Sequence, residues 1–78
     1  MIDIVIVNWN SGNLLAKCVG SIFTEKNYPL VNKIIIVDNH SSDESATQIN
    51  NDEKITKLLN EENTGFSKAC NQGFRLCT

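Results

Sequence analysis

Two short runs of branched apolar residues constrain the fold more than any other feature of the sequence. The first run, Ile2 to Val7, leads into Asn8, and the second, Lys33 to Val37, leads into Asp38. Parallel strands that are buried on both faces are typically unbroken runs of this kind, and open parallel sheets bind ligands beyond the carboxyl ends of their strands. The sequence therefore predicts an α/β fold whose chemistry lies in the two loops that follow these strands.

The segment between the two strands has the spacing of an amphipathic helix. One apolar stripe is formed by residues three and four apart, namely Leu14, Leu15, Cys18, Val19, Ile22 and Phe23. Asn10, Ser11 and Gly12 precede it and offer capping groups. We expect the helix to end near Thr24, because Asn27, Tyr28 and Pro29 form a connector and the residue before a proline avoids helical geometry.

The rest of the chain predicts two more helices and one more strand. A weaker, mostly polar helix is expected from about Asp43 to Asn50, capped by Ser41 or Ser42, with Glu44 at the capping-box position. A third strand is expected from Lys54 to Leu59. After a loop over residues 60–65, a last helix is expected to pack through Phe66, Ala69, Cys70, Gly73, Phe74 and Cys77.

The resulting β-α-β-α-β-α order predicts a Rossmann-like, doubly wound parallel sheet with right-handed crossovers and the second strand in the middle. With 78 residues the chain makes one domain with a small core and marginal stability. Its net charge of −2 and its scattered Lys and Arg residues argue against a nucleic-acid surface. The sequence thus leaves sugars, nucleotides and proteins as candidate partners.

The cysteines and the first residues of the chain indicate in which cellular compartment it is located. Cys18, Cys70 and Cys77 show no CxxC spacing, so we expect reduced thiols buried on helix faces. Met1 runs almost directly into the first strand, and no apolar stretch approaches the roughly 18 residues of a membrane helix. We therefore expect the chain to be located in the cytoplasm.

Two loop residues are the strongest candidates for ligand binding. The first loop lacks the GxGxxG and GxxxxGK[ST] phosphate motifs, but Trp9 between two amides suits a planar base. The alternative is that Trp9 packs over the sheet end. Asp38 can accept a hydrogen bond from a base N–H or a ribose hydroxyl, and its alternative role is to cap a turn. Lys68, early in the last helix, could touch a diphosphate, and its alternative is that of a solvated surface lysine. His40 is expected to be a solvated loop residue.

Residues 4–10, 35–43 and 60–73 are three ordered segments that together resemble a known family, the inverting family 2 glycosyltransferases with the GT-A fold. Residues 4–10 resemble its opening strand and base-binding loop, and residues 35–43 resemble its Val-Val-Asp-Asn-x-Ser-x-Asp segment. Residues 60–73 are similar to its Asn-x-Gly-Phe-x-x-x-x-Asn-x-Gly segment, especially in the rhamnosyltransferase-like branch. Cys70 departs from the pattern, which often has Asn there.

The resemblance implies a UDP- or dTDP-sugar donor and a glycan or lipid-linked acceptor. It places the uracil or thymine base near Val7, Asn8 and Trp9, with Asp38 contacting the base. It places Lys68 and Asn71 near the donor phosphates or in the helix packing behind them. In the full-length enzyme it implies a divalent metal, Mg²⁺ or Mn²⁺, and a location in the cytoplasm, peripheral to the inner face of the membrane.

The family's Asp-x-Asp metal element does not occur in the 78 residues, and its general-base carboxylate has no counterpart. We therefore expect residues 1–78 to be a partial nucleotide-sugar-binding domain, a truncated base-binding half that is inactive and binds no metal alone.

Two alternatives remain. One is a non-catalytic nucleotide-binding or interaction module, which would self-associate through the exposed edge of the first strand. The other is a flavodoxin-like or receiver domain. It is disfavoured because the hydroxyl-rich phosphate loop is missing and Asn8 and Asn10 stand where a receiver needs acids.

Overall fold

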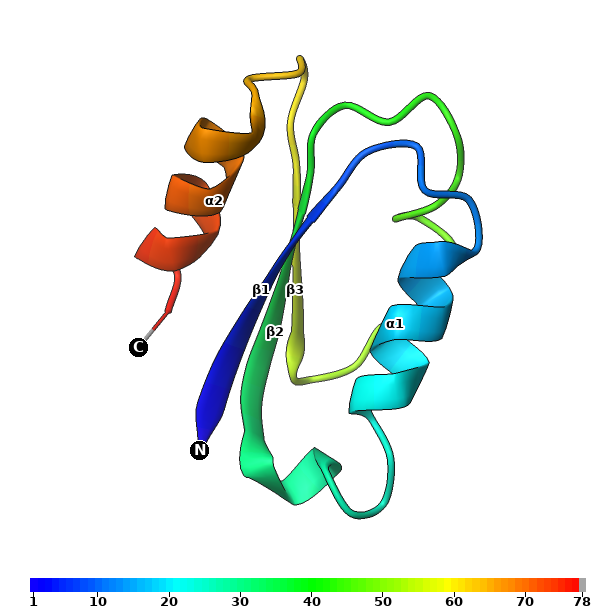
Figure 1. Ribbon diagram of the computed structural model, residues 1–78, viewed down its shortest axis with the longest axis vertical. Coiled ribbons are helices and arrows are strands. Elements are labelled where there is room, and N and C mark those ends of the chain that lie inside the picture. Colours follow the sequence, from blue (N-terminus) through cyan, green and yellow to red (C-terminus); the bar gives the residue numbers. More distant parts are fainter. Residues whose placement is uncertain (78) are drawn as a thin grey trace.

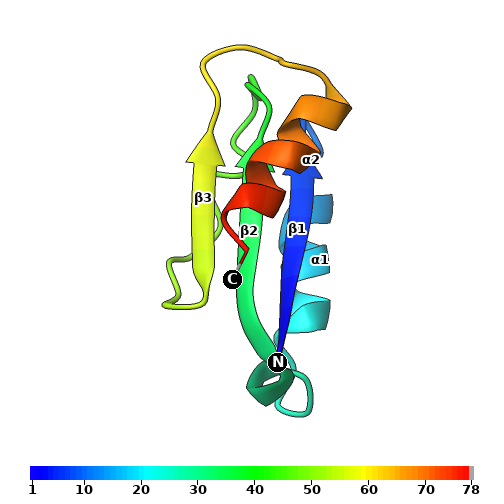
Figure 2. The same cartoon turned by 90° about the vertical axis from the view of Figure 1, so that its left-hand side faces the viewer.

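The computed structural model describes residues 1–77 as a three-stranded parallel sheet with one helix on each face (Figure 1). The elements along the chain are β1 (Ile2–Asn8), α1 (Leu14–Ile22), a 3-10 helix η1 (Tyr28–Leu30), β2 (Val31–Asp38), β3 (Ile55–Leu59) and α2 (Phe66–Arg75). The strand order is β1-β2-β3, so the prediction that the second strand lies in the middle is confirmed. Figure 2 shows the three strands side by side and pointing the same way.

The central strand explains the unbroken apolar run in the sequence. Four consecutive side chains of β2, from Ile34 to Val37, have no exposed surface. Ile34 and Ile36 belong to the core that includes α1, and Ile35 and Val37 belong to the core that includes Ala69 of α2. Because side chains alternate along a strand, a strand covered on both faces requires an apolar residue at every position.

The buried stripe of α1 is narrower than predicted. Leu15 and Val19 are buried, whereas Leu14 is 68% exposed and Cys18 is also exposed. The expectation that Cys18 is a core residue was therefore wrong, because only one side of α1 contacts the sheet. All three cysteines are free thiols, as expected, and Cys70 and Cys77 are partly buried.

The packed face of α2 is built from small residues instead of phenylalanines. Ala69 and Gly73 are buried, whereas Phe66 and Phe74 are 72% and 74% exposed, contrary to the prediction. A Cβ atom added at Gly73 would clash with Val5, which shows how closely the helix backbone approaches β1. This close approach leaves no room for a large side chain at the centre of the contact.

The helix predicted from Asp43 to Asn50 is absent, and this segment consists of bends and turns. Its first backbone N–H groups are bonded to side chains: those of Ser42 and Asp43 to Asn10, and that of Ser45 to Asp43. Such local side-chain bonds compete with the helical ladder, which explains why the capping residues produced turns. The segment still covers the sheet, since Ala46 and Ile49 are buried in the α1-side core.

Candidate functional site

The carboxyl ends of β1 and β2 bring the predicted base-binding residues to one end of the sheet. Val7 pairs with Val37, and Asn8 pairs with Asp38. Trp9 directly follows β1 and is 58% exposed, whereas the neighbouring Asp38 is only 7% exposed. An exposed aromatic ring and a nearly buried carboxylate therefore lie on adjacent strand ends, as the sequence predicted.

Asp38 is held by a buried hydrogen-bond network. Its Oδ1 atom accepts bonds from Asn8 Nδ2 at 2.9 Å and from Ser41 Oγ at 2.6 Å. Its Oδ2 atom accepts one from the backbone N–H of Ser41 at 3.1 Å. Asn8 Nδ2 also donates to Ser45 Oγ at 2.8 Å. The carboxylate is thus fixed in orientation before any ligand arrives, and it also organises the turn after β2, the alternative role considered for it.

The loops after β1 and β2 are tied together. Asn10, in the left-handed region at φ 47°, accepts a bond from the backbone N–H of Ser42 at 2.7 Å. The backbone N–H of Gly12 donates to Asp43 at 3.0 Å. The N-cap of α1 is Asn13, which makes no side-chain cap bond, so Asn10 and Gly12 bond to the loop after β2 and not to the start of the helix. The side-chain hydroxyl of Ser45 donates to Asp43 and, more than any other contact, holds the pKa of that carboxyl below its usual value.

A buried amide that the sequence reasoning missed links β2 to the loop before α2. Asn39 is 3% exposed, and its Oδ1 atom accepts bonds from the backbone N–H of Thr64 at 2.9 Å and from Asn60 Nδ2 at 3.2 Å. Its Nδ2 atom donates to Asn63 at 3.0 Å and to the carbonyl of Gly65 at 3.2 Å. The signal available in the sequence was its place directly after Asp38, at the end of the central strand.

Lys68 and Asn71 lie together on the exposed side of α2. They line a shallow cavity of about 280 Å³ with Thr64, Gln72 and Arg75. No hydrogen bond in the described part of the chain joins either residue to Asp38. His40 is exposed, as expected of a solvated loop residue, and adopts a φ of 67°.

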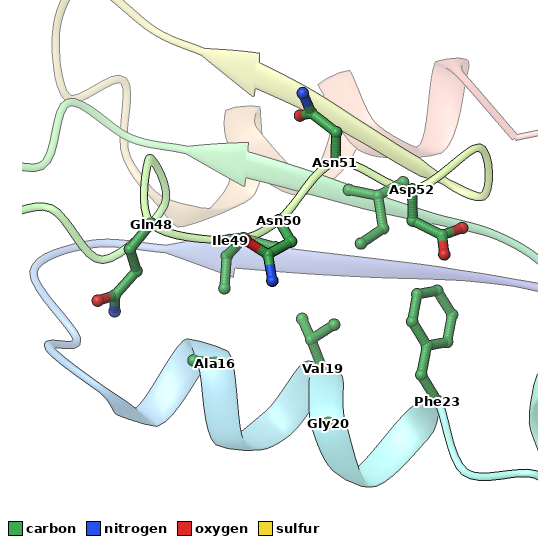
Figure 3. Close-up of a pocket in the computed structure, with 10 residues that line it drawn as sticks. Ala16, Val19, Gly20, Phe23, Gln48, Ile49, Asn50, Asn51 and Asp52 are labelled. Atoms are coloured by element: carbon green, nitrogen blue, oxygen red, sulfur yellow. The ribbon is translucent and has the colours of Figure 1, made fainter.

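A second cavity, of about 290 Å³, lies between α1 and the segment 48–52 (Figure 3). Its lining combines apolar side chains such as Val19, Phe23 and Ile49 with the amides of residues 48, 50 and 51. Asp52 is its one ionisable residue, and its carboxylate accepts bonds from the Tyr28 hydroxyl at 3.1 Å and the backbone N–H of Lys54 at 2.8 Å. The carboxylate is thus engaged in holding the chain, so we assign no chemistry to this cavity.

The acidic groups do not converge on a metal position. Within residues 1–77, no three His, Cys, Asp or Glu side chains are grouped so that they could hold a metal ion. None of the helices in this same range is long and apolar enough to cross a membrane.

Comparison with known proteins adds one match. The family model described as Glycosyl transferase family 2 matches residues 3–78, and this range includes all three segments that suggested the resemblance. No curated protein matches the chain.

Proposed function

Because the chain belongs to glycosyl transferase family 2, we propose that the carboxyl end of its sheet binds the base of the nucleotide-sugar donor in glycosyl transfer. The observation that carries the proposal is the position of exposed Trp9, directly after β1, and of the hydrogen-bonded, nearly buried Asp38 at the end of the adjacent β2. The ring offers a flat apolar face, and the carboxylate accepts hydrogen bonds only, so together they suit a planar base with an N–H at its edge.

Uracil and thymine fit this requirement, since both carry a ring N–H between two carbonyl groups. We therefore propose a UDP- or dTDP-sugar as the donor and a glycan or lipid-linked molecule as the acceptor. Lys68 and Asn71 are the proposed contacts for the donor phosphates, because both are exposed and line the same cavity on α2. Lys68 supplies a positive charge within the first turn of that helix, where anions are favoured.

The family generally depends on a divalent metal, which stabilises the departing diphosphate. Residues 1–77 contain no group of three His, Cys, Asp or Glu side chains that could hold such an ion, and no Asp-x-Asp occurs in the 78 residues. We therefore propose that this chain binds and orients the donor base but does not transfer the sugar alone.

Nucleotide titration tests this proposal, with Trp9 as the probe because it is the single tryptophan of the chain. UDP is expected to quench its fluorescence, with ADP as the comparison nucleotide. Asp38→Asn removes a charged acceptor worth roughly 1.5–3 kcal/mol, so UDP affinity should fall by about 10- to 100-fold. Equal binding of UDP and ADP, or unchanged affinity in Asp38→Asn, would contradict the proposed base site.

Turnover is the second measurement. With Mg²⁺ or Mn²⁺ and a UDP- or dTDP-sugar, the purified 78-residue chain is expected to release no nucleotide above the background rate. Release at the rates usual for enzymes, of the order of 1–10³ s⁻¹, would show that the chain supplies its own catalytic groups.

A non-catalytic interaction module is the second candidate function. It is favoured by one observation: β1 forms an edge of the sheet and carries the exposed Ile2, with Met1 beside it. An apolar strand edge presents unpaired backbone groups that can pair with another chain. We propose self-association through this edge, with sedimentation over a range of concentrations as the test.

A further inference from the structure

We propose that Asn8 is a positioning residue that acts through Asp38 and does not itself touch the base. It holds one carboxylate oxygen of Asp38 within the protein, and the other oxygen keeps an acceptor position for the ligand. This inference rests on the proposed function, and it reassigns Asn8 from direct base contact to the control of base selectivity.

The polar atoms of Asn8 are already engaged within the protein. The residue is 3% exposed, and its two Nδ2 hydrogens have close acceptors in Asp38 at 2.9 Å and Ser45 at 2.8 Å. Its Oδ1 atom accepts a bond from the Ser11 hydroxyl. A base could reach this amide only by displacing bonds that are buried and therefore costly to leave unmade.

The two oxygens of Asp38 are in different situations. Each carboxylate oxygen has two lone-pair positions. Both positions of Oδ1 are used, by Asn8 and by the Ser41 hydroxyl. Among the described residues, Oδ2 receives only the backbone N–H of Ser41, at 3.1 Å. One acceptor position on Oδ2 is therefore left for a ligand, and the carboxylate cannot turn without breaking the bond to Asn8.

A carboxylate held in this way selects between pyrimidines. The ring nitrogen of uracil or thymine that faces it carries a hydrogen and donates. The corresponding nitrogen of cytosine carries a lone pair and is repelled. A carboxylate free to rotate, or able to draw in water, makes this distinction less sharply. Removal of Asn8 is thus expected to change the ratio of the affinities for uracil and cytosine, and not only to weaken both.

The experiment compares UDP with CDP in fluorescence titrations of the 78-residue chain and of Asn8→Ala. The unchanged chain is expected to prefer UDP, and Asn8→Ala is expected to reduce the ratio of UDP to CDP affinity about tenfold, which corresponds to about 1.4 kcal/mol. A merely structural role would lower both affinities together and leave the ratio unchanged. Asn13→Ala is the matched control, because it removes an exposed amide that makes no side-chain cap bond in the same loop.

A second variant keeps the test decisive if Asn8→Ala does not fold. Ser45→Ala removes one acceptor of Asn8 and leaves both Asn8 and Asp38 in place, and it should reduce the same ratio by a smaller factor, about threefold. A folded variant of either kind with an unchanged ratio would overturn the positioning role while leaving the base site intact. Failure of the unchanged chain to bind UDP would overturn the proposed function and this inference together.

Discussion

The close contact between α2 and β1 predicts that Gly73→Ala lowers the stability of the fold. Gly73 lies inside α2, and an added methyl group would clash with one Cγ of Val5 and lie 3.2 Å from a Cγ of Val37. Both neighbours are β-branched, so their rotamers are restricted and they cannot easily turn away. The helix must shift or the valines must leave their preferred conformations.

The size of the effect follows from two opposing terms. Alanine favours a helix interior over glycine by about 1 kcal/mol. Extra volume in a packed core costs typically about 1–3 kcal/mol. With a cost near the middle of that range, Gly73→Ala should lower the free energy of unfolding by about 1 kcal/mol. In a domain of this size that corresponds to a decrease in Tm of about 4–8 °C.

Gly20→Ala provides the matched control. Gly20 also lies inside a helix, α1, but a Cβ atom there would have no neighbour within 4 Å. Its substitution should therefore raise the stability by about 0.4–1 kcal/mol. Urea denaturation of both variants, followed by circular dichroism, measures the difference. If Gly73→Ala is stabilised as much as Gly20→Ala, the reasoning from close backbone approach is refuted.

Three further changes test other parts of the structure. The pKa of Asp43 is lowered from 3.8, so its contribution to stability is present above pH 3.8 and is lost as the pH falls further. Asp43→Asn should therefore lose less stability than the unchanged chain between pH 5 and pH 2, measured by urea denaturation. An equal loss of stability in the two proteins would contradict this. Asn39→Ala leaves the partly buried bonding partners of Asn39 without their bonds and should lower the free energy of unfolding by about 1–3 kcal/mol, measured as a lower urea midpoint. No loss would mean that the loop bonds are not formed. Ile2→Lys adds a charge at the β1 edge and should weaken self-association in sedimentation, whereas equal association would place the contact elsewhere.

The sheet was the most predictable part of the structure. Residues Ile34 to Val37 are all apolar, and among strands only one that is covered on both faces requires this pattern. Its observed span, Val31–Asp38, is longer than the predicted Lys33 to Val37, because Asn32 lies within the strand although its side chain is polar. The position of Asp38 at the carboxyl end of this strand followed directly from the same run.

The errors arose where local signals had more than one solution. The start of a helix is matched by Ser41, Ser42 and Glu44. In the structure, however, the Ser41 hydroxyl accepts a bond from the backbone N–H of Asn10, and the backbone N–H of Ser42 donates to the Asn10 side chain. Those bonds join residues more than 30 positions apart, so no local pattern contains them. Phe66 and Phe74 fit an apolar helix face, but sequence spacing did not show that the closest contact would be made by Gly73.

The order of the strands in the sheet is the same as their order in the chain. Within residues 1–77 each strand therefore pairs with the next strand along the chain, and none of these three strands is inserted between two others that are consecutive in the sequence. The ladders join positions about 30 and 21 residues apart, as in Ile4 with Ile34 and Ile34 with Ile55. The pairing of β1 with β2 is therefore enough to place the loop that carries Trp9 beside the end of the strand that carries Asp38, and β3 adds no residue to that pairing.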